Sequence, residues 1–340
     1  IQDRRPACGT RRPIAELGRI ATLNRGLPIP EALQNKRYRE TGRAQRSERV
    51  VVAVLVTCAL GTVALSFLIV AMLLKESWNF FSSPHVSLTQ FLFGTRWTAL
   101  EVRELDKVEF GIWPLLSGTL RVTGIAMLIA WPMGLITAIY LSEFAGNRVR
   151  RILKPSLEIL AGIPTVVFGY FAVLLISPGL QWFSSSFDTF NATSAGIAVG
   201  ILCLPLVCSL AEDAMSAVPN SLREAVYSLG GTRMNTALGV ILPSALSGVI
   251  SAMLLAFSRA LGETMVVALA AGTLATFTMD PRQQSQTMTG FIVEMLKSDL
   301  EYGTVQYYSL FGVALALFVI TFGMTLLGQL IRRRYREVYQ

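Results

Sequence analysis

The stretch VVVAVLVTCALGTVALSFLIVAMLL, residues 50–74, contains no charged side chain over 25 positions. A helix needs about 20 mostly apolar residues to cross the hydrocarbon core of a bilayer, so this stretch is long enough to span a membrane. The whole chain has the same character, because 52% of its 340 residues are hydrophobic, 15% are charged and its mean hydropathy is +0.51. An ordinary soluble domain is more polar than this. The sequence therefore predicts a membrane protein.

Five further segments are long and apolar enough to form membrane spans. Three of them carry an internal proline, at Pro132, Pro164 and Pro205, which helices inside membrane bundles tolerate. The alternating pattern of a transmembrane β-barrel is absent from the sequence. We therefore predict an all-α polytopic membrane protein with six transmembrane helices, at residues 50–74, 114–141, 155–177, 194–211, 244–272 and 305–331.

The distribution of basic residues orients these spans. With the N-terminus inside, 22 of the 30 Lys and Arg fall in inner segments and six fall in outer loops, while Arg121 and Arg259 lie within spans. Cytoplasmic loops retain Lys and Arg, so the net charge of +8 reflects topology and does not indicate nucleic-acid binding. Both termini and the loop at residues 212–243 are predicted to be cytoplasmic.

Two regions outside the spans leave alternatives open. The basic tail, residues 1–49, is either a solvated segment that fixes topology or contains a basic interfacial helix at residues 31–49. The six-span domain, residues 50–340, includes a long outer loop at residues 75–113. This loop is expected to form a cap or a docking surface, and its three tryptophans are interpreted as interface anchors at span ends: Trp78, Trp97 and Trp113.

No set of catalytic residues is visible in the sequence. Its single histidine, His85, lacks a neighbouring metal-ligand pattern, and its four cysteines indicate neither a disulfide framework nor a metal or redox site. None of the five lysines stands in the GxxxxGK[ST] pattern of a nucleotide-binding loop. We therefore predict a protein that is not an enzyme and that binds no metal or cofactor itself, so any ATP energy must come from another subunit.

The inner loop contains EAVYSLGGTRMNTALGVILPSAL, residues 224–246, which predicts two short helices joined by a hinge. Asn220 or Ser221 is expected to cap the first helix, Gly230 and Gly231 to break it, and a second helix to run towards Leu242. The loop alternates apolar residues with Arg223, Glu224 and Arg233, a pattern that suits insertion of its surface into a groove on a partner protein.

The same loop resembles the coupling-loop motif of bacterial ABC importer permeases, EAAxxxG followed after nine residues by IxLP. The chain departs conservatively from this motif at Val226 and Val240. The resemblance implies that the loop docks on an ATPase subunit, through Glu224, Ala225, Leu229, Gly230, Gly231, Leu242 and Pro243.

Other segments extend the resemblance over residues 50–340 and narrow it to the PstC-type permease of phosphate ABC importers. They are LEILAGIPTVVFGYFAVL (157–174), LPLVCSLAEDAM (204–215), SRALGETMVVALAAG (258–272) and the terminal RRRYREVYQ. The resemblance implies a PstA-like second permease, two copies of a PstB-like ATPase that bind ATP and Mg, and a PstS-like external phosphate-binding protein. It also implies a multi-pass protein surrounded by lipid in the bacterial inner membrane.

Passage of an anion requires positive groups within the membrane, because uncompensated charge is costly there. Arg259 and Glu263, four residues apart, are expected to share a helix face and form either a structural pair or part of the substrate path. Arg121 is either a second path residue or one that pairs or reaches outward. The alternatives to a phosphate permease are a permease for molybdate, sulfate or a phosphonate, a non-transporting membrane scaffold or sensor, and, least favoured, an embedded enzyme.

Overall fold

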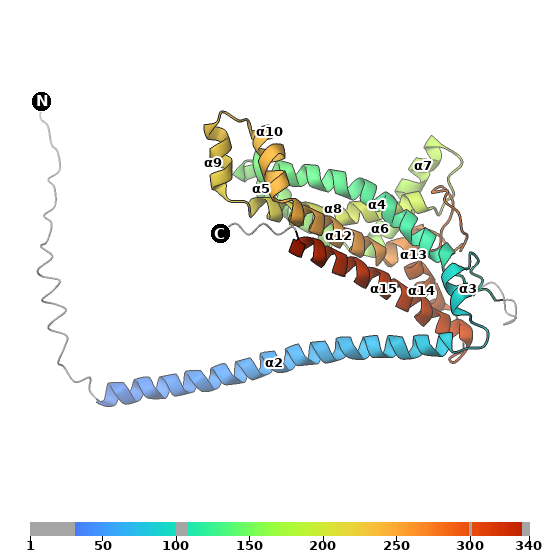
Figure 1. Ribbon diagram of the computed structural model, residues 1–340, viewed down its shortest axis with the longest axis horizontal. Coiled ribbons are helices and arrows are strands. Elements are labelled where there is room, and N and C mark those ends of the chain that lie inside the picture. Colours follow the sequence, from blue (N-terminus) through green and yellow to red (C-terminus); the bar gives the residue numbers. More distant parts are fainter. Residues whose placement is uncertain (1–30, 100–107, 299–300, 335–340) are drawn as a thin grey trace, which may run out of the picture. The chain divides into compact units, whose positions relative to one another are not determined.

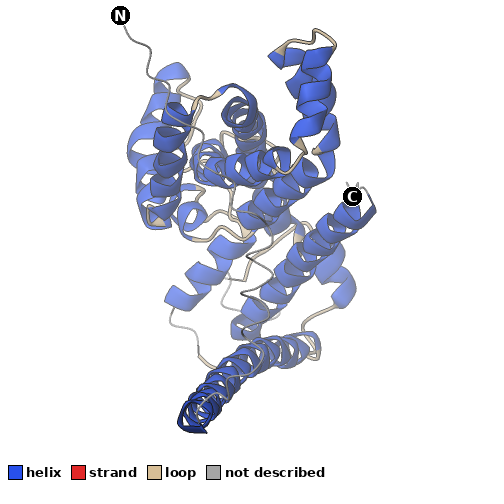
Figure 2. Cartoon of the chain, turned by 90° about the vertical axis from the view of Figure 1, so that its left-hand side faces the viewer, coloured by secondary structure: helices blue, strands red, loops and turns tan. Residues whose placement is uncertain are grey.

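A computed structural model describes residues 31–99, 108–298 and 301–334 (Figures 1 and 2). It divides the chain into two units, Ile1–Ile69 and Val70–Gln340, which are described separately. Within the described ranges the regular structure is helical, apart from an isolated β-bridge between Trp97 and Phe110. Residues 1–30 of the predicted tail and residues 335–340 of the terminal motif lie outside the described residues.

The first helix, α2 (Glu31–Phe81), begins in the first unit and ends in the second. Residues 31–49 are therefore the beginning of the helix that contains the first span, and they do not form a separate helix. All side chains at positions 48–69 are exposed although most are apolar. An apolar helix with this much exposed surface is suited to contact with lipid or another membrane chain.

The second unit is built around α4 (Trp113–Ile139) and α8 (Ala192–Ser216), which pack side by side along the unit (Figure 1). Glycine lets the two helices approach closely, because a Cβ atom at Gly200 would lie 2.9 Å from the carbonyl oxygen of Ala126. The other helices are α3 (Leu88–Phe93), α5 (Asn147–Gly162), α6 (Thr165–Phe171), α7 (Ser177–Phe183), α9 (Asn220–Ser228), α10 (Arg233–Thr236), α11 (Leu242–Ser244), α12 (Leu246–Leu261), α13 (Met265–Ala270), α14 (Met288–Lys297) and α15 (Val305–Arg334), with π-helices η2 (Tyr140–Phe144), η3 (Ala172–Ile176) and η4 (Ala237–Ile241).

The spans agree with the predicted fold class. Five helical segments of the described chain are long and apolar enough to cross a membrane, and a sixth is obtained if one bent pair is counted as a span. The bent pair joins Arg233–Ser244 to Leu246–Leu261 at 71° and overlaps the fifth predicted span only over residues 244–261. The five continuous segments are Glu48–Phe81, Trp113–Phe144, Thr165–Phe183, Ala192–Ser216 and Val305–Ile331.

The third predicted span, residues 155–177, begins ten residues too early. Residues 155–162 belong to α5, an amphipathic helix that buries none of its side chains and ends at Gly162. Ile163 and Pro164 are extended, and the spanning segment starts at Thr165. The cause is Pro164, because a proline ring disfavours helical geometry in the residue before it.

The fifth predicted span, residues 244–272, is also not one continuous helix. The helix α12 ends at Leu261, and α13 begins only at Met265 after three non-helical residues. Glu263 lies in this break, so the expected placement of Arg259 and Glu263 on one helix face is wrong. No ion pair joins their side chains among the described residues.

The outer loop forms a folded cap where its residues are described. Trp97 is only 4% exposed and makes edge-on contacts with Phe110 and with Phe291 of α14, at centroid distances of 5.8 and 4.9 Å. The interpretation of Trp97 as an interface anchor is therefore wrong, whereas Trp78 is 74% exposed. The cap lies at the end of the second unit opposite α9 and α10 (Figure 1).

Candidate functional site: a docking knob and a charged cavity

Residues 220–244, from α9 to α11, form a protruding pair of short helices that we call the knob (Figure 1). The turn at its tip is a Schellman motif. The N–H of Gly230 donates to the carbonyl of Tyr227, and the N–H of Gly231 donates to that of Val226, both at 2.9 Å. Gly230 has φ +82°, a left-handed conformation that favours glycine. The predicted break at the two glycines is confirmed.

The helix caps of the knob differ in part from the prediction. The residue before α9 is Pro219, so Asn220 is the first helical residue, and neither Asn220 nor Ser221 occupies the capping position. The second helix is capped by Thr232, whose side chain accepts a hydrogen bond from the N–H of Asn235 at 3.3 Å. A side-chain cap therefore marks the start of α10, whereas α9 starts after Pro219 without one.

The tip of the knob exposes large apolar side chains beside a free carboxylate. Leu229 is 89% exposed, and Tyr227, Met234 and Leu238 are each at least 44% exposed. Glu224 is exposed, and its carboxylate has no hydrogen bond or ion pair to any described residue. Exposed apolar groups rimmed by charge indicate a protein-docking surface. Of the predicted docking residues, Gly231 and Leu242 are half-buried and the remainder are exposed: Glu224, Ala225, Leu229, Gly230 and Pro243.

Arg223 anchors the base of the knob and is not one of its surface charges. Its Nη2 lies 2.9 Å from the carboxylate of Glu143 in η2, and the same group donates to the carbonyl of Met215. Its Nη1 donates to the carbonyl of Val218 at 2.7 Å. The side chains of Arg223 and Glu143 are 15% and 4% exposed. This buried ion pair attaches the knob to the ends of α4 and α8.

A second ion cluster lies nearby, and sequence reasoning missed it. Glu212 of α8 is completely buried and pairs with two cations of α5, Arg150 and Lys154, the latter at 2.7 Å. The hydrogen bond from Lys154 to Glu212 raises the pKa of this lysine above its ordinary value. The available signal was the spacing of Arg150 and Lys154, because residues four apart face the same side of a helix.

Arg259 lines a cavity of about 220 Å³ between α5, α8 and α12. The same cavity is lined by Lys154, Glu158 and Glu212, so two cations and two carboxylates meet there. The Arg259 side chain is exposed and makes no hydrogen bond or ion pair with another described residue. Its fork of donors is therefore available to an anion.

The other two path candidates are placed differently. Glu263 is 9% exposed and lies outside α12, where its backbone carbonyl accepts a hydrogen bond from Thr289. Arg121 donates to the carbonyl of Asp280 and to the hydroxyl of Ser285, each at 2.7 Å. Arg121 thus ties α4 to the loop before α14, which favours its structural interpretation.

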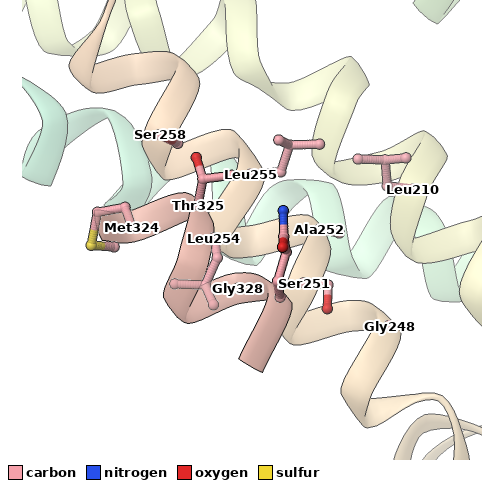
Figure 3. A pocket seen from close by; sticks show the side chains of 11 residues that line it. Leu210, Gly248, Ser251, Ala252, Leu254, Leu255, Ser258, Met324, Thr325 and Gly328 are labelled. Carbon is pink, nitrogen blue, oxygen red and sulfur yellow. The ribbon is translucent and has the colours of Figure 1, made fainter. Parts of the chain in front are cut away.

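A different groove, on the surface between α12 and α15, is unsuited to an anion (Figure 3). It measures about 330 Å³ and has no charged side chain in its lining, which consists of Leu210, Gly248, Ser251, Ala252, Leu254, Leu255, Ser258, Met324, Thr325, Gly328 and Gln329. The described residues also contain no group of three His, Cys, Asp or Glu side chains arranged as metal ligands.

The helical membrane unit has the fold of ABC importer permease subunits. It resembles a crystal structure of a bacterial ABC transporter involved in the import of the acidic polysaccharide alginate, with a TM-score of 0.59 at 13% identity. The match covers 88% of this chain and all of the other. At this identity the likeness shows the fold alone.

Sequence comparisons establish the family. Residues 130–337 match the family described as the binding-protein-dependent transport system inner membrane component, and the chain belongs to this family of ABC importer permeases. It is 31% identical to the probable ABC transporter permease protein YqgH of Bacillus subtilis (strain 168), over 91% of this chain and 97% of the relative. It is 27% identical to the phosphate transport system permease protein PstC of Xylella fastidiosa (strain 9a5c), over 80% and 88%. The resemblance stated from the motifs is confirmed, and the role of such a subunit is transport across a membrane, not catalysis.

Proposed function

We propose that this chain is the PstC-like permease of an ATP-driven phosphate importer and forms half of the translocation path. The observation that carries the proposal is the unpaired Arg259 in a charged cavity between α5, α8 and α12. The relatives named as phosphate permeases support the substrate. Molybdate, sulfate or a phosphonate remains the alternative, because a guanidinium binds any tetrahedral oxyanion in much the same way.

The charge pattern of the cavity suits an anion that must enter and then leave. An arginine within a span costs a few kcal/mol on insertion scales, so its retention calls for a function. Lys154 adds a second cation, while Glu158 and Glu212 offset the positive charge. This balance would keep binding weak enough for release.

The knob supplies the link to ATP. Its exposed leucine and free carboxylate would dock into a groove on a PstB-like ATPase, two copies of which bind ATP and Mg. The Arg223–Glu143 pair would transmit the movement of the knob to α4 and α8. A PstA-like second permease and a PstS-like external phosphate-binding protein complete the assembly, and both termini and the knob would lie on the cytoplasmic side of the inner membrane.

The test is ATP-driven uptake of labelled phosphate into vesicles that contain the assembled complex. Unlabelled phosphate should compete fully, whereas equal sulfate or molybdate should not. Arg259→Gln should abolish uptake, and Arg148→Gln, which removes an exposed arginine of α5 that lines no described cavity, should leave uptake intact. Uptake of labelled molybdate or sulfate by vesicles that take up no labelled phosphate would assign another oxyanion, and normal phosphate uptake by Arg259→Gln would remove Arg259 from the path.

A further inference from the structure

A polar recess of about 450 Å³ lies between the knob and the structure beneath it. Arg150 of α5, Arg223 of α9 and Arg233 of α10 line it together with one carboxylate, that of Glu143. Its charged lining groups therefore carry a formal net charge of +2. The remaining lining is also polar and consists of Ser142, Ser216, Asn220 and Tyr227.

The three arginines differ in the hydrogen-bond donors that they leave free. Arg223 uses all five N–H donors on Glu143, Asn220 and two backbone carbonyls. Arg150 donates through Nη2 to Glu212, and no described acceptor takes its other donors. Arg233 is exposed and has no hydrogen bond or ion pair to a described residue. The free donors of the recess thus come from α5 on one side and from the knob on the other.

We propose that this recess binds a small tetrahedral oxyanion of the inorganic phosphate class, held between Arg150 and Arg233. Guanidinium groups match the geometry of phosphate oxygens with pairs of parallel hydrogen bonds, and two from different elements provide opposed contacts. The Tyr227 hydroxyl and the Asn220 amide add neutral donors at the same wall.

The ion cluster below the recess makes Arg150 available for this role. Glu212 is held by Lys154 as well as by Arg150, so an arriving anion can draw Arg150 away without leaving the buried carboxylate unpaired. An anion with two negative charges would also balance the +2 charge of the recess. The site is therefore arranged for exchange of partners and not for permanent occupancy.

An anion in this position would bridge the knob to α5 and restrain the knob against the movement that couples it to ATP. If the chain imports phosphate, the anion delivered on the knob side is also the ligand of the recess. Occupancy would then slow further import when internal phosphate is high. This feedback rests on the proposed function, whereas binding to the recess does not.

The binding test uses the purified complex of permeases and ATPase, without nucleotide and without the external binding protein, with Arg259→Gln as the background so that the transport cavity does not contribute. Labelled inorganic phosphate should bind saturably, and adding Arg233→Gln should weaken this binding about tenfold or more, the loss expected for one charge-assisted contact. Adding Arg148→Gln should leave it unchanged. Equal binding with and without Arg233→Gln would overturn the site.

A second measurement separates the recess from other sources of the same chemistry. Phosphate added on the nucleotide side should slow ATP hydrolysis by the complex, each variant being compared with its own rate without phosphate, and Arg233→Gln should relieve this inhibition. Phosphate acting at the ATPase itself would inhibit both forms equally and overturn the feedback. Labelled phosphate binding is also compared between vesicles of two lipids. Binding that persists in phosphatidylcholine vesicles but disappears in phosphatidylglycerol vesicles would assign the recess to a lipid headgroup. Loss of ATPase association in Arg233→Gln without any effect on phosphate binding would assign it to a carboxylate of the partner.

Discussion

The Glu212 cluster should respond unequally to removal of its two halves. Glu212 is completely buried, whereas the side chains of Arg150 and Lys154 are 40% and 34% exposed. Glu212→Gln leaves two cations that can turn to water. Arg150→Gln combined with Lys154→Met leaves an uncompensated carboxylate inside the protein, which cannot reach water in the same way.

The expected magnitudes follow from this difference in exposure. Removing one partner of a buried pair costs about 3–5 kcal/mol when the remaining charge stays buried. Exposed ion pairs contribute about 0–1 kcal/mol. We therefore expect the double cation variant to lose about 3–5 kcal/mol and Glu212→Gln, which breaks two pairs, to lose about 0–2 kcal/mol. Neutralising all three residues should recover much of the larger loss, because no buried charge is then left.

Two buried cysteines provide the assay. Cys203 and Cys208 lie in α8 and are buried, so a thiol-reactive dye labels them only when the second unit opens. Replacing Cys8 and exposed Cys58 by Ser removes the background. The melting temperature of the assembled complex in detergent should then be highest for wild type, lower for Glu212→Gln and lowest for the double cation variant. A Glu212→Gln variant at least as unstable as the double variant would refute the reasoning.

Three further predictions concern the knob, the Lys154 ammonium and the loop at residues 272–287. Glu224→Lys should leave the permease in the membrane but release the ATPase on affinity purification and stop uptake. The control is Glu301→Lys, which reverses an exposed charge just before α15 and should change neither ATPase association nor uptake. Equal losses in both variants would count against docking through Glu224. The raised pKa of Lys154 means that its stabilisation is present below its ordinary pKa of 10.5 and is lost as the pH rises through the folded value. The melting temperature measured with the thiol-reactive dye should therefore fall more steeply above about pH 10.5 in wild type than in Lys154→Met. Parallel curves of melting temperature against pH would contradict this. Arg121→Gln should free the loop at residues 272–287 for protease cleavage from outside while preserving the inner end of the unit, and an unchanged cleavage rate would show that other contacts hold the loop.

The spans could be predicted because hydropathy depends on composition along the chain. Their ends could be predicted less well, and the two large errors share a cause. Around Pro164 and Gly262 the longer segments on both sides are apolar on average, although Glu263 directly follows Gly262, so hydropathy averaged over a span continues where the helix stops. The first stop is made by the proline ring, whereas Gly262 ends α12 at φ −89° and ψ 3°, so no left-handed glycine marks the second stop.

The knob and the ion clusters show a second contrast. The two glycines of the tip determine a turn that closes within six residues, and the sequence alone predicts it. The Arg223–Glu143 pair joins residues 80 positions apart, and the Arg150–Glu212 pair joins residues 62 apart. No local pattern selects those partners, because the packing of α4, α5 and α8 brings them together. The same limit explains why Arg223 was expected at the surface.

Arg259 combines these points into a last prediction. It is an exposed, unpaired cation in an apolar helix, and Glu263, the partner suggested by sequence spacing, lies beyond the end of that helix. Its burial in a membrane therefore costs free energy that no described neighbour offsets by an ion pair. Arg259→Leu should accordingly insert and melt at least as well as wild type in the dye assay, yet transport no phosphate. If Arg259 were instead a structural partner of Glu263, Arg259→Leu would melt lower and the further change Glu263→Gln would restore both melting and uptake. The position of the helix end at Leu261 favours the first outcome.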